Sequence, residues 1–102
     1  MPTNGVVALT NGNYVVGSLR WDNGANVDAG AATWGNGATG TSGLVSAANS
    51  LVGGGSGYFV GSTVALTNGN YVVASSSWGN GSLTDVGAVT LGDGATGTSG
   101  AV

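Results

Sequence analysis

The sequence predicts an all-β protein built from two copies of one repeat, and three observations carry this prediction. The nine residues ALTNGNYVV occur at 8–16 and again at 65–73. At an offset of 57 residues, 27 of the 39 residue pairs between 7–45 and 64–102 are identical. Short runs rich in valine, threonine and aromatic residues alternate with glycine- and asparagine-rich turns, which is typical of strands and hairpins. A fixed period of this length indicates that each copy is one supersecondary unit.

The first three strands of the unit follow from its turns. Strands are predicted at Val6–Thr10 and Asn13–Trp21, joined by Asn11-Gly12, because Asn-Gly between two β-rich runs favours a type I′ hairpin turn. Asp22-Asn23-Gly24 interrupts the pattern, and a third strand is predicted at Ala29–Trp34. Its counterpart in the second copy is Val86–Leu91.

The segment Leu44–Val52, LVSAANSLV, is the fourth element. Its alternation predicts a strand, whereas Ala47 and Ala48 would suit a short helix. We favour the strand because every neighbouring element is β. Gly53–Gly57 then reads as a linker, so that the chain divides into a first repeat at 1–57 and a second at 58–102.

Each repeat is therefore expected to be a four-stranded antiparallel meander, which is the blade of a β-propeller. The second copy reaches Val102 where its counterpart of 44–52 would begin, so it is expected to lack its fourth strand. A β-solenoid is the alternative, with parallel strands and no Asn-Gly hairpins. A two-sheet sandwich made of both copies is a third possibility.

Two blades cannot close a ring, and this leads to an expectation of self-association. The lateral faces and an incomplete edge would stay open, and the chain has no lysine to discourage edge pairing. Other copies of the chain are expected to cover these surfaces, as a homo-oligomeric trimer or tetramer or as a fibre.

Composition argues against several other functions. The five charged residues are Arg20, Asp22, Asp28, Asp85 and Asp93. One arginine cannot neutralise a phosphate backbone, so nucleic acid is not an expected partner. No apolar run reaches the roughly 20 residues that a membrane span requires, and MPTNGVVAL has no secretory-signal pattern. Cysteine and histidine are absent, which removes the commonest nucleophile–base and metal-ligand chemistry.

These absences lead us to expect a non-enzymatic protein without a cofactor or metal. Asp28 and Asp85 occupy equivalent positions where aspartate commonly satisfies turn backbone. The loop from Asp22 to Asp28 has oxygen ligands suited to calcium, but turn formation explains the same residues.

Carbohydrate is the one ligand for which the sequence offers a candidate site. Trp21 and Asn23, with their counterparts Trp78 and Asn80, place an indole beside an amide at a strand end, where the ring could stack on a sugar. Packing between blades is the competing interpretation for both tryptophans, and a core position is favoured for Trp34.

Four strings resemble repeats of large secreted bacterial adhesins of the filamentous-haemagglutinin type: ALTNGNYVV, WDNG, GAATWGNGATG and VSAANSLVG. The resemblance covers nearly the whole chain and implies an extracellular or cell-surface setting with a structural or adhesive role. The second copy departs from these strings, because Trp34 is replaced by Leu91 and Asp22 by Gly79. A site that relied on either residue would be lost there.

Overall fold

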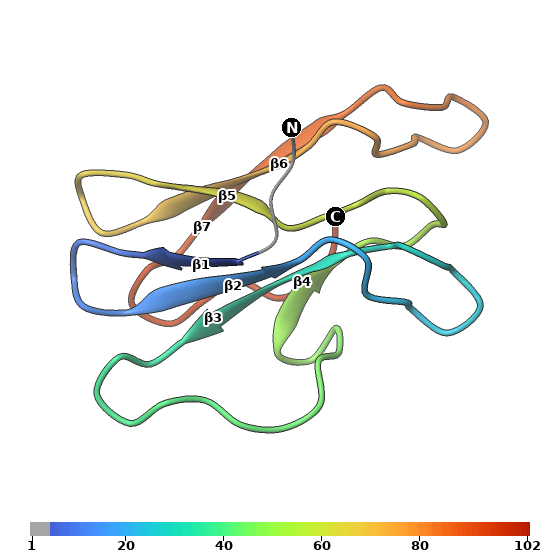
Figure 1. Cartoon of the computed structure of the whole chain (residues 1–102). Coiled ribbons are helices and arrows are strands. Elements are labelled where there is room, and N and C mark those ends of the chain that lie inside the picture. The colour runs from blue at the N-terminus through green and yellow to red at the C-terminus, as the bar shows by residue number, and fades with distance from the viewer. Residues whose placement is uncertain (1–4) are drawn as a thin grey trace.

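The computed structural model describes residues 5–102, which form strands and loops without a helix (Figure 1). Met1–Asn4, the start of the segment searched for a secretory signal, lie outside the described residues. The strands are β1 (Gly5–Ala8), β2 (Tyr14–Ser18), β3 (Ala31–Gly35), β4 (Ser50–Val52), β5 (Ser62–Ala65), β6 (Tyr71–Ser75), β7 (Ala88–Gly92) and β8 (Gly100–Ala101). The all-β prediction is confirmed. Within residues 5–102 there is no apolar helix long enough to traverse a lipid bilayer.

The first repeat forms the predicted four-stranded antiparallel meander. Strands β1, β2, β3 and β4 lie side by side in chain order, and each pairs antiparallel with the next. The ambiguous segment 44–52 resolves into a turn followed by strand β4, so the strand prediction is confirmed for its last three residues. The turn is closed by Asn49, whose Oδ1 accepts a hydrogen bond from the Ser46 amide at 2.9 Å.

The second repeat forms a separate antiparallel sheet of three strands, in the order β5-β6-β7. The prediction that it lacks its own fourth strand is confirmed. The short strand β8 instead pairs parallel with β4 of the first sheet, an arrangement that the sequence analysis did not predict. Because the strands within each repeat are antiparallel, the β-solenoid alternative is wrong for the described residues.

The hairpin loops differ from the predicted type I′ turn. Of the pair Asn11-Gly12, only Gly12 has a positive φ, at 93°. The Leu9 carbonyl accepts a hydrogen bond from the Gly12 amide, and the Leu9 amide donates to the Asn13 carbonyl. This is a longer loop, in which a turn is followed by a glycine in the left-handed region. The prediction was wrong because Asn-Gly also fits that loop, with the asparagine in an ordinary conformation.

The hydrophobic core lies between the two sheets. Its buried members are Leu9, Val15, Ala32, Leu51, Val60, Tyr71 and Val73, with Trp34, Tyr58, Ala65 and Val102 packed around them. Strand β2 lies very close to the segment that leads into β5: a Cβ added at Gly17 would lie 2.4 Å from the carbonyl oxygen of Gly61. Glycine at that position therefore permits the distance between the sheets.

The segment after β4 packs along the loop between β2 and β3. The amides of Gly57, Phe59 and Val60 donate to successive backbone carbonyls of residues 27–29. Val60 is fully buried and also forms a parallel bridge with Gly30. The glycine-rich stretch thus leads into a segment held by backbone hydrogen bonds, which fixes where the second sheet begins.

Candidate functional site: the outer faces of the two sheets

Each sheet has two chemically distinct faces, because successive side chains of a strand point to opposite sides. We call one side the front face, which carries Val7, Val15, Gly17, Ala32 and Trp34 in the first repeat and Val64, Val72, Ala74, Val89 and Leu91 in the second. The other side is the back face, which carries Val6, Tyr14, Val16, Ser18 and Thr33 in the first repeat and Thr63, Tyr71, Val73, Ser75 and Thr90 in the second.

The sheets meet through unlike faces. Val15 and Ala32, on the front face of the first repeat, are 0% and 1% exposed. Tyr71 and Val73, on the back face of the second, are 1% and 0% exposed, and all four belong to the same core cluster. Two copies facing each other as a two-fold sandwich would bring equivalent faces together. Here successive repeats stack head to tail instead.

A polar cluster beside the core fixes this stack. The carbonyl oxygen of Gly94, in the loop after β7, accepts hydrogen bonds from three side chains of the first repeat. The donors are Asn11 Nδ2 and Asn13 Nδ2, each at 2.8 Å, and Trp34 Nε1 at 2.9 Å. The predicted core position of Trp34 is confirmed in part, because its side chain is half-buried and packs against the core cluster. Bonds of this kind are directional, so they specify how the two repeats are aligned.

The front face of the second repeat is uncovered. Val64, Val89 and Leu91 are 60%, 73% and 64% exposed. Val64 lies on β5, and Val89 and Leu91 both lie on β7, on the other side of β6; the other front-face residues of this repeat are also uncharged. A contiguous apolar surface of this kind is unusual for a face that stays in water.

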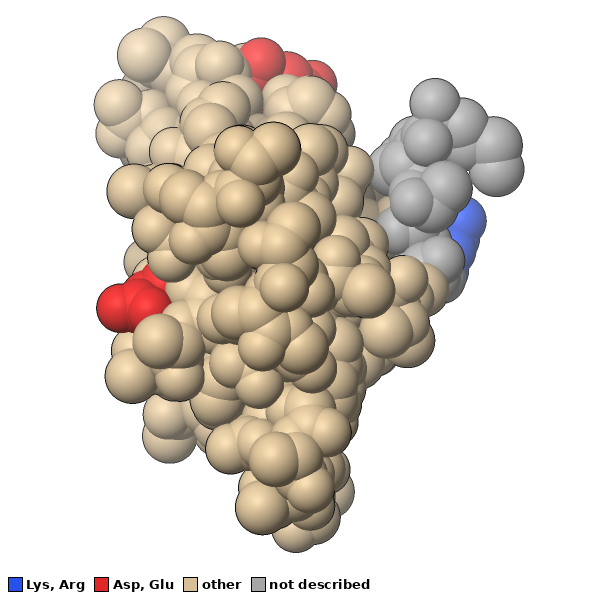
Figure 2. All heavy atoms as spheres, turned by 90° about the vertical axis from the view of Figure 1, so that its left-hand side faces the viewer, with Lys and Arg blue, Asp and Glu red and all other residues tan. Residues whose placement is uncertain are grey.

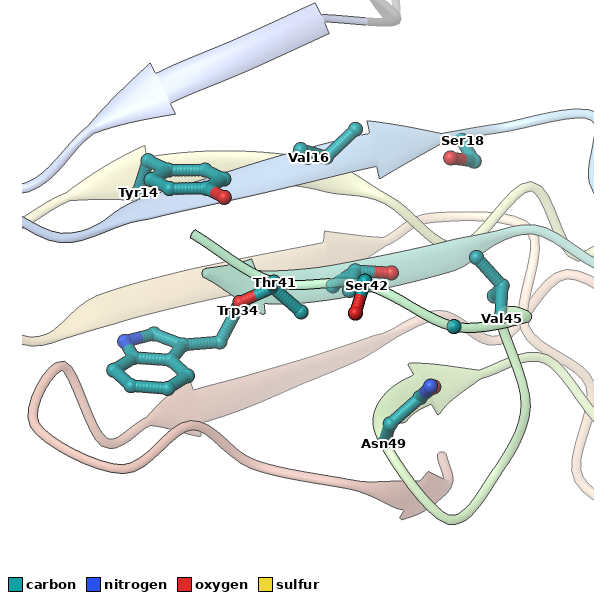
Figure 3. A pocket seen from close by; sticks show the side chains of 10 residues that line it. Tyr14, Val16, Ser18, Trp34, Thr41, Ser42, Val45 and Asn49 are labelled. Atoms are coloured by element: carbon teal, nitrogen blue, oxygen red, sulfur yellow. The ribbon is translucent and has the colours of Figure 1, made fainter. Parts of the chain in front are cut away.

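The back face of the first repeat is only partly covered. Tyr14, Val16 and Ser18 lie along β2 and line a hollow of about 190 Å³, whose other wall is the loop that leads into β4 (Figure 3). Tyr14 and Val16 are half-buried, whereas their counterparts Tyr71 and Val73 are fully buried. The two equivalent back faces therefore differ in how completely they are covered.

Charge contributes little to either outer face. Figure 2 shows a side of the molecule on which uncharged residues cover almost the whole surface. Arg20 pairs with Asp28, with Nη1 3.5 Å from Oδ2. The Asp28 backbone amide in turn donates to Asp22 Oδ1 at 2.9 Å. Asp28 and its counterpart Asp85 both have positive φ, at 57° and 53°, which aspartate tolerates better than most residues.

The residues of the candidate carbohydrate site lie in two separate loops, one in each repeat. Asn23 pairs with Asn26 across the first loop, and its side-chain amide donates to the Gly53 carbonyl at 3.0 Å. Trp21 is half-buried at the start of that loop. Its backbone carbonyl accepts a hydrogen bond from Gly30, which closes the loop.

The corresponding loop of the second repeat is more open. Trp78 is half-buried and its Nε1 donates to the Val102 carbonyl at 2.9 Å, whereas Asn80 is exposed and pairs with Leu83 through its backbone. Among the described residues, no hydrogen bond joins the Trp21–Asn23 pair to the Trp78–Asn80 pair. The two pairs thus occupy equivalent positions without forming a common site.

The sequence analysis did not predict that Asn11 and Asn13 join the two repeats. Asn11 and Asn13 lie in a string that reads as a turn, and turn formation alone explains both of them. Their bonds to Gly94 join residues more than 80 positions apart, which no local pattern reveals. The one available signal was that both asparagines recur unchanged as Asn68 and Asn70.

The comparisons with known proteins identify the repeat without assigning it an activity. No curated protein and no solved structure matches the chain. The family model of a repeat of unknown function (DUF5650) matches residues 8–62 and again residues 65–102. The first match contains β2, β3 and β4, and the second contains β6, β7 and β8. The chain belongs to the DUF5650 repeat family, of which it contains two copies.

Proposed function

We propose that this chain is a non-enzymatic β-repeat module whose function is structural or adhesive and depends on self-association. The observation that carries the proposal is the exposed apolar face of the second repeat, formed by Val64, Val89 and Leu91. Each such side chain gains about 1.5–3 kcal/mol from full burial. No lysine or glutamate is present in the chain to oppose contact between copies.

The assembly we propose is a β-propeller completed by several chains. A four-stranded meander is the usual propeller blade, and the first repeat has this form. Three chains would supply six blades and four chains eight, whereas a stack that fails to close would grow into a fibre. An extracellular or cell-surface setting is part of the proposal, on the basis of the resemblance to secreted bacterial adhesins.

Sedimentation equilibrium of the purified chain over a wide range of concentrations tests this proposal. The chain has a mass of 9.6 kDa. We expect the average mass to rise with concentration toward a discrete multiple of this value, with three or four copies favoured, or without limit for a fibre. A mass that stays at that of one chain up to millimolar concentration would refute self-association.

Carbohydrate binding by the same propeller is the second candidate. The hollow on the first repeat favours it, because Tyr14 lies there beside the polar side chains of Ser18, Thr41, Ser42 and Asn49. The loops that hold Trp21 and Trp78 would provide further contacts.

A glycan array separates the two candidates. Binding that is lost in both Trp21→Ala and Trp78→Ala, with the oligomer mass unchanged, would support the carbohydrate site. Loss of the oligomer in these variants would instead assign the tryptophans to packing, and the absence of any glycan signal from the wild-type chain would remove the candidate.

A further inference from the structure

We infer that copies of this chain join head to tail, with the front face of the second repeat of one copy docked on the back face of the first repeat of the next. The inference rests on the proposed self-association and adds which surfaces meet. The contact between the repeats within one chain provides the template, because it joins the same two types of face. Each chain has one further copy of both partners: an exposed front face on the second repeat, and a back face on the first repeat that residues 41–49 partly cover.

The apolar part of the template is available on both outer surfaces. Within the chain, Tyr71 and Val73 are covered by the front face of the first repeat. Tyr14 and Val16 are the same residue types at the equivalent positions, and they border the open hollow (Figure 3). Val89, at 73% exposure, occupies the position of Ala32 and is the side chain that would cover Val16 of a second copy.

The polar part of the template is also present twice. Asn68 and Asn70 repeat Asn11 and Asn13, and Gly37 repeats Gly94. Asn70 Oδ1 already accepts a hydrogen bond from the Gly94 amide at 3.0 Å, as Asn13 Oδ1 does from Gly37 at 2.9 Å.

The donors of this second polar cluster have no protein acceptor within the described residues. Across residues 5–102, the side-chain amide nitrogens of Asn68 and Asn70 donate to no protein atom, although their counterparts both donate to Gly94. The Gly37 carbonyl of a neighbouring copy would accept both of these hydrogen bonds. Contact between two front faces, or between two back faces, would not bring these donors to this acceptor.

Two differences between the repeats make the contact between chains weaker than the contact within one. Leu91 replaces Trp34 and so removes the third hydrogen bond to the glycine carbonyl. Ala74 replaces Gly17, where an added Cβ meets the backbone of the facing segment. Restoring the residues of the first repeat is therefore expected to tighten association. Leu91→Trp, which regains one hydrogen bond, should lower the dissociation constant by roughly tenfold.

A complementation experiment tests the geometry. Val89→Asp disables the front face of the second repeat, and Val16→Asp disables the back face of the first. Val6→Asp, at a position that is 68% exposed, is a second back-face variant in case Val16→Asp does not fold. Leu83→Asp places the same charge at an exposed apolar residue of the loop between β6 and β7, and it serves as the control. Folding of each variant is checked by thermal unfolding.

Head-to-tail assembly predicts that each single-face variant stays monomeric, with self-association weakened by about 100-fold or more. An equimolar mixture of a front-face and a back-face variant should form a 1:1 dimer and nothing larger, because each retains one intact surface. The control should associate like the wild-type chain.

Three results would overturn the inference, and they differ from failure of the proposed function. A back-face variant that dimerises by itself would indicate contact between front faces. A front-face variant that dimerises by itself would indicate contact between back faces. Two folded variants that form no dimer when mixed, although the wild-type chain associates, would place the interface elsewhere. A wild-type chain that remains monomeric would refute self-association itself.

Discussion

The substitution Gly17→Ala tests the close approach of the two sheets. A Cβ at this position would lie 2.4 Å from the Gly61 carbonyl oxygen and 3.3 Å from its carbonyl carbon. Because both atoms belong to backbone, the clash can be relieved only by moving β2 away from the segment that leads into β5. Inserting one methyl group into such a packed contact costs about 1–3 kcal/mol.

The second repeat contains the matched control for this substitution. Ala74 is the counterpart of Gly17, but it lies on the uncovered front face and is exposed. Alanine should be better than glycine on an open strand by about 0.5–1 kcal/mol, so Ala74→Gly should destabilise the monomer by that small amount. Alanine in place of glycine is therefore expected to destabilise the folded chain at position 17 and to stabilise it at position 74.

Urea unfolding at a protein concentration low enough to keep the chain monomeric measures both effects. We expect Gly17→Ala to lower the free energy of unfolding by about 1–3 kcal/mol, which for a domain of this size corresponds to roughly 4–8 °C in Tm per kcal/mol. A Gly17→Ala chain as stable as the wild type, or more stable, would show that the sheets are not in contact there.

Three further predictions concern the two repeats. Trp34→Leu should lower the free energy of unfolding by about 2–4 kcal/mol in thermal unfolding, because it removes buried ring surface and a hydrogen bond. Leu91→Ala, on the open face, should change the same free energy by less than about 0.5 kcal/mol. Equal effects of the two substitutions would contradict the different surroundings of Trp34 and Leu91. Asn13→Ala should cost about 1 kcal/mol more than Asn70→Ala in urea unfolding, since only Asn13 also donates across the repeats, and equal costs would contradict the polar cluster. Burial raises the pKa of the Tyr71 phenol above its ordinary value of 10.0. Above about pH 10 the unfolded chain therefore loses a phenol proton that the folded chain keeps. The free energy of unfolding should fall as the pH rises through this range, and it should fall less steeply in Tyr71→Phe. An unchanged slope in that variant would contradict the buried phenol.

Much of the fold follows from the repeat and from local chemistry. The offset between Tyr14 and Tyr71 aligns the two copies, and the turn residues divide each copy into strands. The three strands of the second sheet, β5, β6 and β7, correspond to β1, β2 and β3 at the same offset. These features could be predicted because each depends on residues close together in sequence or on identity between the copies.

Other features could not be predicted, because they arise where the two copies meet. Strand β8 forms at Gly100–Ala101 only because β4 of the first repeat offers a free edge, and Gly43–Leu44 form no strand without such a neighbour. The hairpin turn type was wrong because Asn11-Gly12 is compatible with two loops. The sequence also does not indicate which faces are buried, since equivalent valines differ between the copies: Val15 is fully buried and Val72 half-buried, whereas Val73 is fully buried and Val16 half-buried.

The candidate site shows the same division. An indole beside an amide predicts sugar binding at Trp21 and Trp78, but the sequence contains no information on what surrounds these two side chains. The hydrogen bonds to Gly94 could not be predicted, because they form only where the stacked sheets place Asn11 and Asn13 beside the loop after β7. The two outer faces differ from their buried counterparts because of where the sheets pack, and no sequence motif marks this difference.

Methyl NMR over a range of protein concentrations would test head-to-tail stacking most directly. The account predicts that the methyl resonances of Val89 and Leu91 on one outer face, and of Val16 on the other, shift together along one binding curve, while those of the loop residue Leu83 stay constant. If only one face responds, or neither does while the mass of the particle rises, copies of the chain do not stack in this way.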